Sequence, residues 1–112
     1  MHRPGTDPLN VQMTDVLCDF CHSDWTADRP MVEGHHGSVI CGSCLTVAYA
    51  EVVVADLDQR IPSYRCTMCL EEREQSAWRS PAHEEAFICE RCIRLAARQL
   101  ERDPDLPWSA PR

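Results

Sequence analysis

The chain contains no lysine, few aromatic residues and no long hydrophobic run. All 11 basic residues are arginine, so catalysis through a lysine amine and a lysine-containing phosphate-binding loop are both excluded. Nothing approaches the roughly 18 consecutive apolar residues that a membrane span needs. Residues 1–8 also lack the apolar core of a secretory signal. We therefore expect a cytoplasmic protein that makes no membrane contact.

The charge is acidic and unevenly distributed. There are 18 acidic residues against the 11 arginines, which gives a net charge of −7. Phosphate neutralisation supplies most nonspecific affinity for nucleic acids, so nucleic acid is not the favoured partner of so acidic a chain. Residues 63–112 hold 8 of the 11 arginines, but they also hold 9 of the acidic residues. Even the arginine-rich half is therefore not basic.

Cysteine is what the chain has in excess, and it is arranged as a repeat. Both halves read Cys-x2-Cys-x19-Cys-x2-Cys, with the second set 48 positions after the first. A single offset shared by four cysteines indicates a tandem duplication. We predict zinc unit 1 over residues 16–60 and zinc unit 2 over residues 64–103, with a link around residues 61–63. Residues 1–15 and 104–112 hold five of the eight prolines and are predicted to be flexible tails.

Two Cys-x2-Cys pairs about 20 residues apart are a strong signature of a zinc site with four thiolate ligands. Such a site is a closed tetrahedron and is structural rather than catalytic. A unit of about 45 residues rarely folds on its own core, whereas zinc contributes roughly 10–16 kcal/mol to small metal-dependent modules. We therefore predict two zinc ions and no enzyme activity. The eight predicted ligands are Cys18, Cys21, Cys41, Cys44, Cys66, Cys69, Cys89 and Cys92.

Disulfides and haem are the competing interpretations of these cysteines. An even number would suit disulfides, but a reducing compartment disfavours them. Cys18-Asp19-Phe20-Cys21-His22 matches the c-type haem attachment pattern, yet Leu70 replaces the histidine in the second unit. His35 and His83 could also bind zinc. With four cysteines already present in each unit, we expect these two histidines to be polar residues of a turn.

The order of elements predicts a small zinc-bound α+β fold of two ββα units. In each unit the first cysteine pair forms a tight turn, or knuckle, and a hairpin follows. The first hairpin has its turn at residues 34–37 and the second at residues 80–83, both rich in turn-forming residues. The second cysteine pair is expected to open a helix, whose N-terminal dipole favours thiolates.

The two predicted helices differ in how much apolar surface they carry. The second has one apolar stripe of residues 93, 96, 97 and 100, and the arginines at 91, 94, 98 and 102 lie opposite it. The first is apolar almost all round up to Leu57, so we expect it to be buried on more than one side. Its Val52-Val53-Val54 run has strand propensity, but the repeat favours a helix. The simplest burial partner is the other unit, which predicts a pseudo-twofold internal pair. A homodimer through this face is the alternative.

Three segments carry a resemblance to a known family: Cys18-Asp19-Phe20-Cys21, Val39-Ile40-Cys41-Gly42-Ser43-Cys44 and Phe87-Ile88-Cys89-Glu90-Arg91-Cys92. With the helix that follows, each unit resembles the N-terminal, ClpX-type zinc-binding domain of the ClpX unfoldase. The resemblance implies treble-clef-like units that pair tightly, have no catalytic activity and bind substrates or adaptor peptides through exposed apolar surface. The ATPase is absent here, and two copies lie on one chain.

We therefore favour a non-enzymatic, zinc-stabilised protein–protein interaction module, such as an adaptor or regulator that binds a protein or peptide. The predicted partner contacts are Phe20, Trp25, Met68 and Trp78, with core packing as the alternative for each. Trp108, in the proline-rich tail, is either a docking peptide or packs back on the domain.

Two other functions stay open. One is a nucleic-acid-binding regulatory protein that uses the arginine face of the second helix. Against it, Glu90 and Glu101 stand at helical spacing to pair with those arginines. The other is a redox switch in which oxidation of the thiolates ejects the metal.

Overall fold

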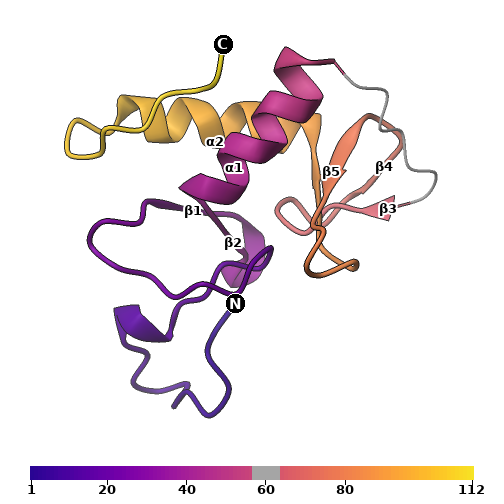
Figure 1. The fold of residues 1–112 in the computed structure, drawn as a ribbon. Helices are drawn as coiled ribbons and strands as arrows, with labels where there is room; N and C mark the ends of the chain where they lie inside the picture. Colours follow the sequence, from indigo (N-terminus) through magenta and orange to yellow (C-terminus); the bar gives the residue numbers. More distant parts are fainter. Residues whose placement is uncertain (57–63) are drawn as a thin grey trace.

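The computed structural model describes residues 1–56 and 64–112, and in each half it shows a β-hairpin followed by a helix (Figure 1). The predicted end of unit 1, its Leu57 and the link at residues 61–63 lie outside the described residues. The elements of unit 1 are β1 (Met31–Glu33), β2 (Val39–Cys41) and α1 (Gly42–Tyr49), with a π-helical turn at Ala50–Val54. The elements of unit 2 are β3 (Tyr64–Arg65), β4 (Glu72–Arg73), β5 (Ala77–Arg79), β6 (Phe87–Cys89) and α2 (Glu90–Arg102). Two short 3-10 turns, Met13–Asp15 and His35–Gly37, complete the set, and the predicted α+β class is confirmed.

The backbone pairing repeats with the sequence. β1 pairs antiparallel with β2, and β5 pairs antiparallel with β6, so that the third cysteine of each unit lies opposite the first residue of the hairpin. In unit 2, β3 and β4 form a two-stranded ribbon in which Arg65 pairs with Glu72. The bridge between Leu17 and Asp24 is the same pairing 48 positions earlier. This ribbon, which carries the knuckle at its tip, was not part of the sequence prediction.

The hairpins differ by a two-residue insertion that the cysteine spacing conceals. The loop between the strands spans residues 34–38 in unit 1 and residues 80–86 in unit 2. Ser38 N–H donates to His35 O, and Ala86 N–H donates to His83 O, so these two histidines are equivalent. Residues 81–82 are therefore the insertion, and the segment between knuckle and hairpin is shorter in unit 2 to match.

Both helices begin as predicted, directly after the third cysteine of the unit. The predicted apolar stripe of α2 is buried. In α1 the corresponding Leu45 and Ala48 are buried, and so is Val52 in the π-helical turn, which confirms the helical prediction for the valine run. The expected burial on more than one side is limited, because Val47 and Val54 are each 45% exposed. Only one side of α1 meets the other unit, so its outward valines stay in solvent.

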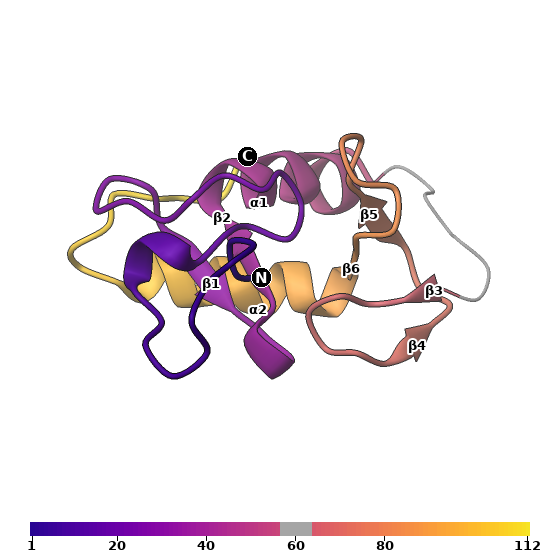
Figure 2. The ribbon, with the colours of Figure 1, turned by 90° about the horizontal axis from the view of Figure 1, so that it is seen from below.

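The two units share one hydrophobic core. Helices α1 and α2 cross in contact, α2 packs on β1, and the π-helical turn packs on β5 (Figures 1 and 2). The polar contacts between the units are reciprocal. His35 N–H of the first hairpin donates to Met68 O of the second knuckle at 2.8 Å. The Ser80 hydroxyl of the second hairpin donates to Phe20 O of the first knuckle.

Both terminal segments lie against unit 1. His2 forms a β-bridge with Val16, and the amino group of Met1 lies 2.9 Å from the Asp19 carboxylate. At the other end, the indole N–H of Trp108 donates to Thr46 Oγ1 at 3.0 Å. Trp108 therefore packs back on the domain, which was the second of the two alternatives for it. The flexibility of these tails stays a prediction. Among the described residues, no helix has the length and apolar character to cross a lipid bilayer.

The close approach of Gly34 to the second knuckle generates a test of the unit interface. A Cβ at Gly34 would lie 2.6 Å from Met68 O and 3.0 Å from Met68 Cε. We expect Gly34→Ala to lower the free energy of unfolding by about 1–3 kcal/mol, the usual cost of overpacking, and to shift the Met68 methyl resonance. Denaturation and methyl NMR of the metal-loaded protein measure both effects.

Gly37→Ala is the matched control for this variant. Gly37 has φ +75° but open space around it, so an added methyl group strains only its own backbone. We expect this variant to lose stability while leaving the Met68 resonance in place. An unchanged Met68 signal in Gly34→Ala would contradict the described packing.

Candidate metal centres

Each unit brings four sulfur atoms together from two elements. The knuckle supplies the first pair, and the start of the helix supplies the second, one at the N-cap and one at the third helical residue. Within each group all sulfurs lie within 4.8 Å of one another. Six of the eight cysteines are buried, while Cys21 and Cys69 are half-buried. The first group is Cys18, Cys21, Cys41 and Cys44, and the second is Cys66, Cys69, Cys89 and Cys92.

The sulfur separations match a tetrahedral metal site. Zinc binds thiolate at about 2.3 Å, so the edge of a regular tetrahedron of four sulfurs is about 3.8 Å long. The Sγ atoms of Cys18 and Cys44 are 3.9 Å apart, and those of Cys21 and Cys41 are 3.7 Å apart. In unit 2, Cys66 and Cys92 are separated by 3.8 Å. A single ion of this size therefore fits at the centre of either group.

The same geometry decides against the competing interpretations. A disulfide needs sulfurs about 2.05 Å apart, and all eight cysteines are free. Haem attachment would use Cys18 and Cys21 alone, whereas these two converge with a second pair from α1. Neither group contains a histidine. The expectation that His35 and His83 are turn residues rather than ligands agrees with this.

Backbone amides stabilise the sulfurs of the knuckle. Cys18 Sγ accepts N–H groups from Phe20 at 3.4 Å and from Cys41 at 3.3 Å. Cys66 Sγ accepts the N–H of Cys89 at 3.5 Å. Hydrogen bonds to the charged form of a group favour that form, so these donors favour thiolates. These hydrogen bonds therefore favour the deprotonated form of the sulfur, which is the form that binds a cation.

Each knuckle closes through a residue with left-handed backbone. His22 has φ 60° and Leu70 has φ 63°, and their N–H groups donate to Cys18 O and Cys66 O at 2.8 Å. Left-handed backbone costs L-residues about 1–2 kcal/mol per residue. The residue at this position is not among the four sulfur ligands of its unit. His22 instead stacks on His83 of the other unit, with ring centroids 3.4 Å apart.

The thiols of each group interact strongly in the absence of a cation. Hydrogen bonds with Cys18 and Cys44 lower the pKa of Cys41 to about 3. Hydrogen bonds with Cys18 and Cys41 raise the pKa of Cys44. In unit 2, hydrogen bonds with Cys89 and Cys92 lower the pKa of Cys66, and the pKa of Cys92 is raised. Full deprotonation requires a divalent cation to balance the charge.

The surroundings of the two groups differ in charge. Arg73 lies beside the second group, and its hydrogen bond to Cys69 raises the pKa of the guanidinium. Trp25 stands at the equivalent position of unit 1. In unit 1 the Asp19 carboxylate instead accepts the Val39 N–H at 2.7 Å and so ties the knuckle to β2. The position of Asp19 between Cys18 and Cys21 in the sequence predicts that it lies near the first sulfur group. No sequence pattern predicts that Arg73 lies near a sulfur.

The predicted partner contacts are corrected by their burial. Phe20, Met68 and Trp78 are 1%, 4% and 4% exposed, so a partner cannot reach them in this structure. They are buried because each knuckle packs under the hairpin of the other unit. Phe20 contacts Trp78 with ring centroids 5.8 Å apart. Core packing, the alternative weighed for each of them, accounts for all three, and only Trp25 is partly exposed.

The arginine face of α2 is exposed. Arg91, Arg94 and Arg98 surround Leu95, which is 44% exposed, along a shallow depression of about 420 Å³. The predicted ion pair between Glu90 and Arg94 forms at 3.3 Å. For Glu101, no ion pair is found within residues 1–56 and 64–112. The face therefore carries both signs of charge.

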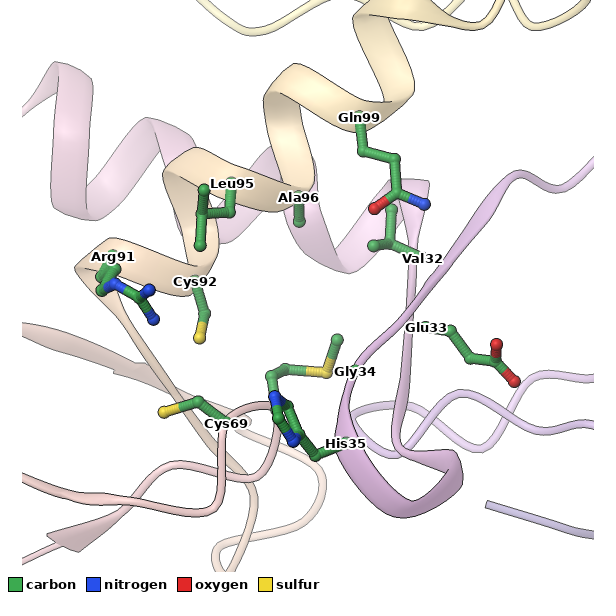
Figure 3. A pocket seen from close by; sticks show the side chains of 11 residues that line it. Val32, Glu33, Gly34, His35, Cys69, Arg91, Cys92, Leu95, Ala96 and Gln99 are labelled. Carbon is green, nitrogen blue, oxygen red and sulfur yellow. The ribbon is translucent and has the colours of Figure 1, made fainter.

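A small cleft opens between the units next to the second sulfur group (Figure 3). Val32, Gly34 and His35 line it from unit 1, while Cys69 and Cys92 reach it from the knuckle and from α2. Its volume is about 250 Å³. Pockets for small molecules are usually about 300–1,000 Å³ and more enclosed, so this cleft suits a side chain of a protein better than a cofactor.

Comparison of the chain with models of protein families, with curated proteins and with solved structures finds no match. The ClpX-type resemblance therefore rests on the cysteine frame and the flanking residues alone. The structure itself establishes two groups of four cysteines, each able to hold a metal ion.

The geometry predicts two metal ions per chain with independent ligand sets. We expect native mass spectrometry of the zinc-loaded protein to show two ions, and Cys44→Ser to show one. Ser43→Ala, which changes an exposed residue between the two helix-borne ligands, should retain both. Loss of both ions in Cys44→Ser would show that the sites are coupled, and retention of both would remove Cys44 from the ligand set.

The strained knuckle predicts an unusual order of stability at position 70. Leu70→Gly removes the left-handed strain at the cost of some apolar burial, so we expect stability within about 1 kcal/mol of the natural chain. Leu70→Val places a β-branched residue in the same conformation and should be about 1–2 kcal/mol less stable than the glycine variant. Chemical denaturation in saturating zinc measures the difference. Equal stability of the two variants would contradict the described backbone.

Proposed function

We propose that the protein is a non-enzymatic, zinc-stabilised module for protein–protein interaction, with one structural zinc ion in each unit. The observation that carries the zinc assignment is the pair of four-sulfur groups with tetrahedral spacing. Four soft thiolate ligands select zinc over hard cations such as magnesium and calcium. A site with four protein ligands has no position left for water or substrate, so the ions stabilise the fold and do not catalyse.

We further propose that the units are treble-clef-like copies related by a pseudo-twofold axis, as in a ClpX-type domain. Three observations support this. Each unit has the order knuckle, hairpin, helix, with ligands from the knuckle and the first helical turn. The knuckle of each unit meets the hairpin of the other. The helices cross at the centre and run in opposite directions (Figure 2).

Exposed apolar residues support a protein partner over other classes. Three large apolar side chains are nearly half exposed: Val47, Val54 and Leu95. Small units bury little surface on folding, so apolar side chains left in solvent reduce the stability that the core can supply. We propose that these side chains form part of a surface that contacts another protein. The cleft between the units is small, and the net charge of −7 opposes nucleic acid.

The proposal is tested by measuring binding with the zinc-loaded full chain. We expect affinity purification with quantitative mass spectrometry to identify a protein that then binds the purified chain with micromolar or tighter affinity. Leu95→Asp or Val47→Asp, each changing an exposed residue, should weaken that binding at least tenfold. Val11→Asp is the matched control, because Val11 is 40% exposed but lies in the N-terminal segment.

Two results would overturn the proposal. One is the absence of any protein that binds the purified, zinc-loaded chain. The other is binding of RNA or DNA in low salt that is lost when Arg91, Arg94 and Arg98 are replaced by glutamine. The second result would favour the nucleic-acid alternative.

A further inference from the structure

The C-terminal tail occupies a groove on unit 1 that nothing else in the fold requires. After α2 the chain turns back at residues 103–105 and runs along the N-terminal end of α1 (Figures 1 and 2). Leu106 and Trp108 are half-buried against the core, while Pro107 and Ser109 between and after them are exposed. The tail therefore binds through two alternate side chains, as an extended peptide does.

The indole of Trp108 makes the specific contacts. Its Nε1–H lies 3.0 Å from Thr46 Oγ1 and 3.2 Å from Gly42 O. A Cβ at Gly42 would lie 2.9 Å from Pro30 Cγ and 3.2 Å from Trp108 Cδ1, so the glycine lets both side chains approach the helix closely. Tryptophan is one of the residues enriched among the energetic hot spots of protein interfaces.

The groove lies next to the first group of four cysteines. Gly42 stands between Cys41 and Cys44, two of the sulfur ligands, and its N–H donates to Pro30 O at 2.8 Å. The equivalent depression of unit 2 has a different lining, because Glu90 occupies the position of Gly42 and Arg94 that of Thr46. The lining that Trp108 contacts is thus specific to unit 1 and is not a consequence of the repeated fold.

The tail fills this groove incompletely. A cavity of about 320 Å³ remains between the tail and the opposite wall, and it is lined by Ala27, Asp28, Pro30 and residues 105–108. Among the described residues, no backbone hydrogen bond joins residues 104–112 to unit 1. Two side chains and one indole N–H therefore hold the segment, and the space beside them could take a further side chain.

We propose that this groove is the peptide-docking site of the module, for an extended segment with an apolar residue two positions before a tryptophan, and that the tail is its resident occupant. This inference rests on the proposed function and names the site and the partner chemistry. A tethered segment acts at an effective concentration of roughly millimolar. A partner segment must therefore bind more tightly than the tail, or contact additional surface, in order to displace it.

The test uses the full chain, loaded with two zinc ions, in the variant Trp108→Ala. The probe is a synthetic peptide of residues 103–112 with a blocked N-terminus. We expect it to bind Trp108→Ala with a dissociation constant of about 0.1 mM. The natural chain should bind it roughly tenfold more weakly, since its own tail competes at about 1 mM.

Two matched changes locate the binding. The peptide carrying alanine in place of its tryptophan should not bind. The double variant Trp108→Ala, Thr46→Val keeps the shape of the groove but removes one acceptor, and it should bind the natural peptide several-fold more weakly than Trp108→Ala does. Equal affinity of the peptide for the natural chain and for Trp108→Ala would overturn the proposal, and so would no binding to a Trp108→Ala chain that retains both ions.

A measurement on the natural chain keeps the proposal testable if Trp108→Ala does not fold. In a ¹⁵N-labelled sample the indole N–H resonance of Trp108 should move to its free position as excess peptide is added. A resonance that stays in place at several millimolar peptide overturns the proposal. These experiments test one groove and one peptide. The groove proposal can therefore be wrong while a protein partner still binds elsewhere on the chain, so its failure is distinguishable from a failure of the proposed function.

Discussion

The convergence of four sulfurs between a knuckle and a helix N-terminus is the interaction on which the rest of the structure depends. Each unit has a hairpin with strands of three residues and a helix of only 8 or 13 residues. Helices and hairpins this short are marginal in water by themselves. A bound zinc ion contributes roughly 10–16 kcal/mol in modules of this size and joins the knuckle, the last hairpin strand and the helix at one point.

The second constraint is that neither unit completes its core alone. Phe20 of one knuckle lies under the hairpin of unit 2, and Met68 of the other lies against Gly34 of unit 1. Ile40, Ile88 and the two helices then form one cluster across both units. Each group of four cysteines connects the elements of its own unit, whereas the apolar contacts join the two units into a single body. This division explains why the aromatic and sulfur-containing residues next to the cysteines are buried rather than available to a partner.

The duplicated units have diverged where they meet solvent. Unit 1 has an acidic knuckle with Asp19, the exposed valines of α1 and the groove that holds Trp108. Unit 2 has Arg73 beside its sulfurs and the arginine face of α2. Since the cores are equivalent and the surfaces are not, the two halves share one structural role and present different surfaces to solvent. The proposed interaction function is consistent with this asymmetry.

Sequence reasoning alone determined the repeat, the grouping of the eight cysteines, both hairpins and the start of both helices. These features depend on local spacing: a two-residue gap brings two sulfurs together, and an apolar stripe repeats every three or four residues. Only the tertiary structure decided which apolar residues face the other unit. Phe20 and Trp78 are buried while Val47 and Val54 are exposed, and all four look alike in the sequence. Burial of this kind is set by contacts between residues about 60 positions apart. The place of Trp108 on Gly42 and Thr46 was likewise decided by the fold, because no local pattern specifies a contact across such a distance.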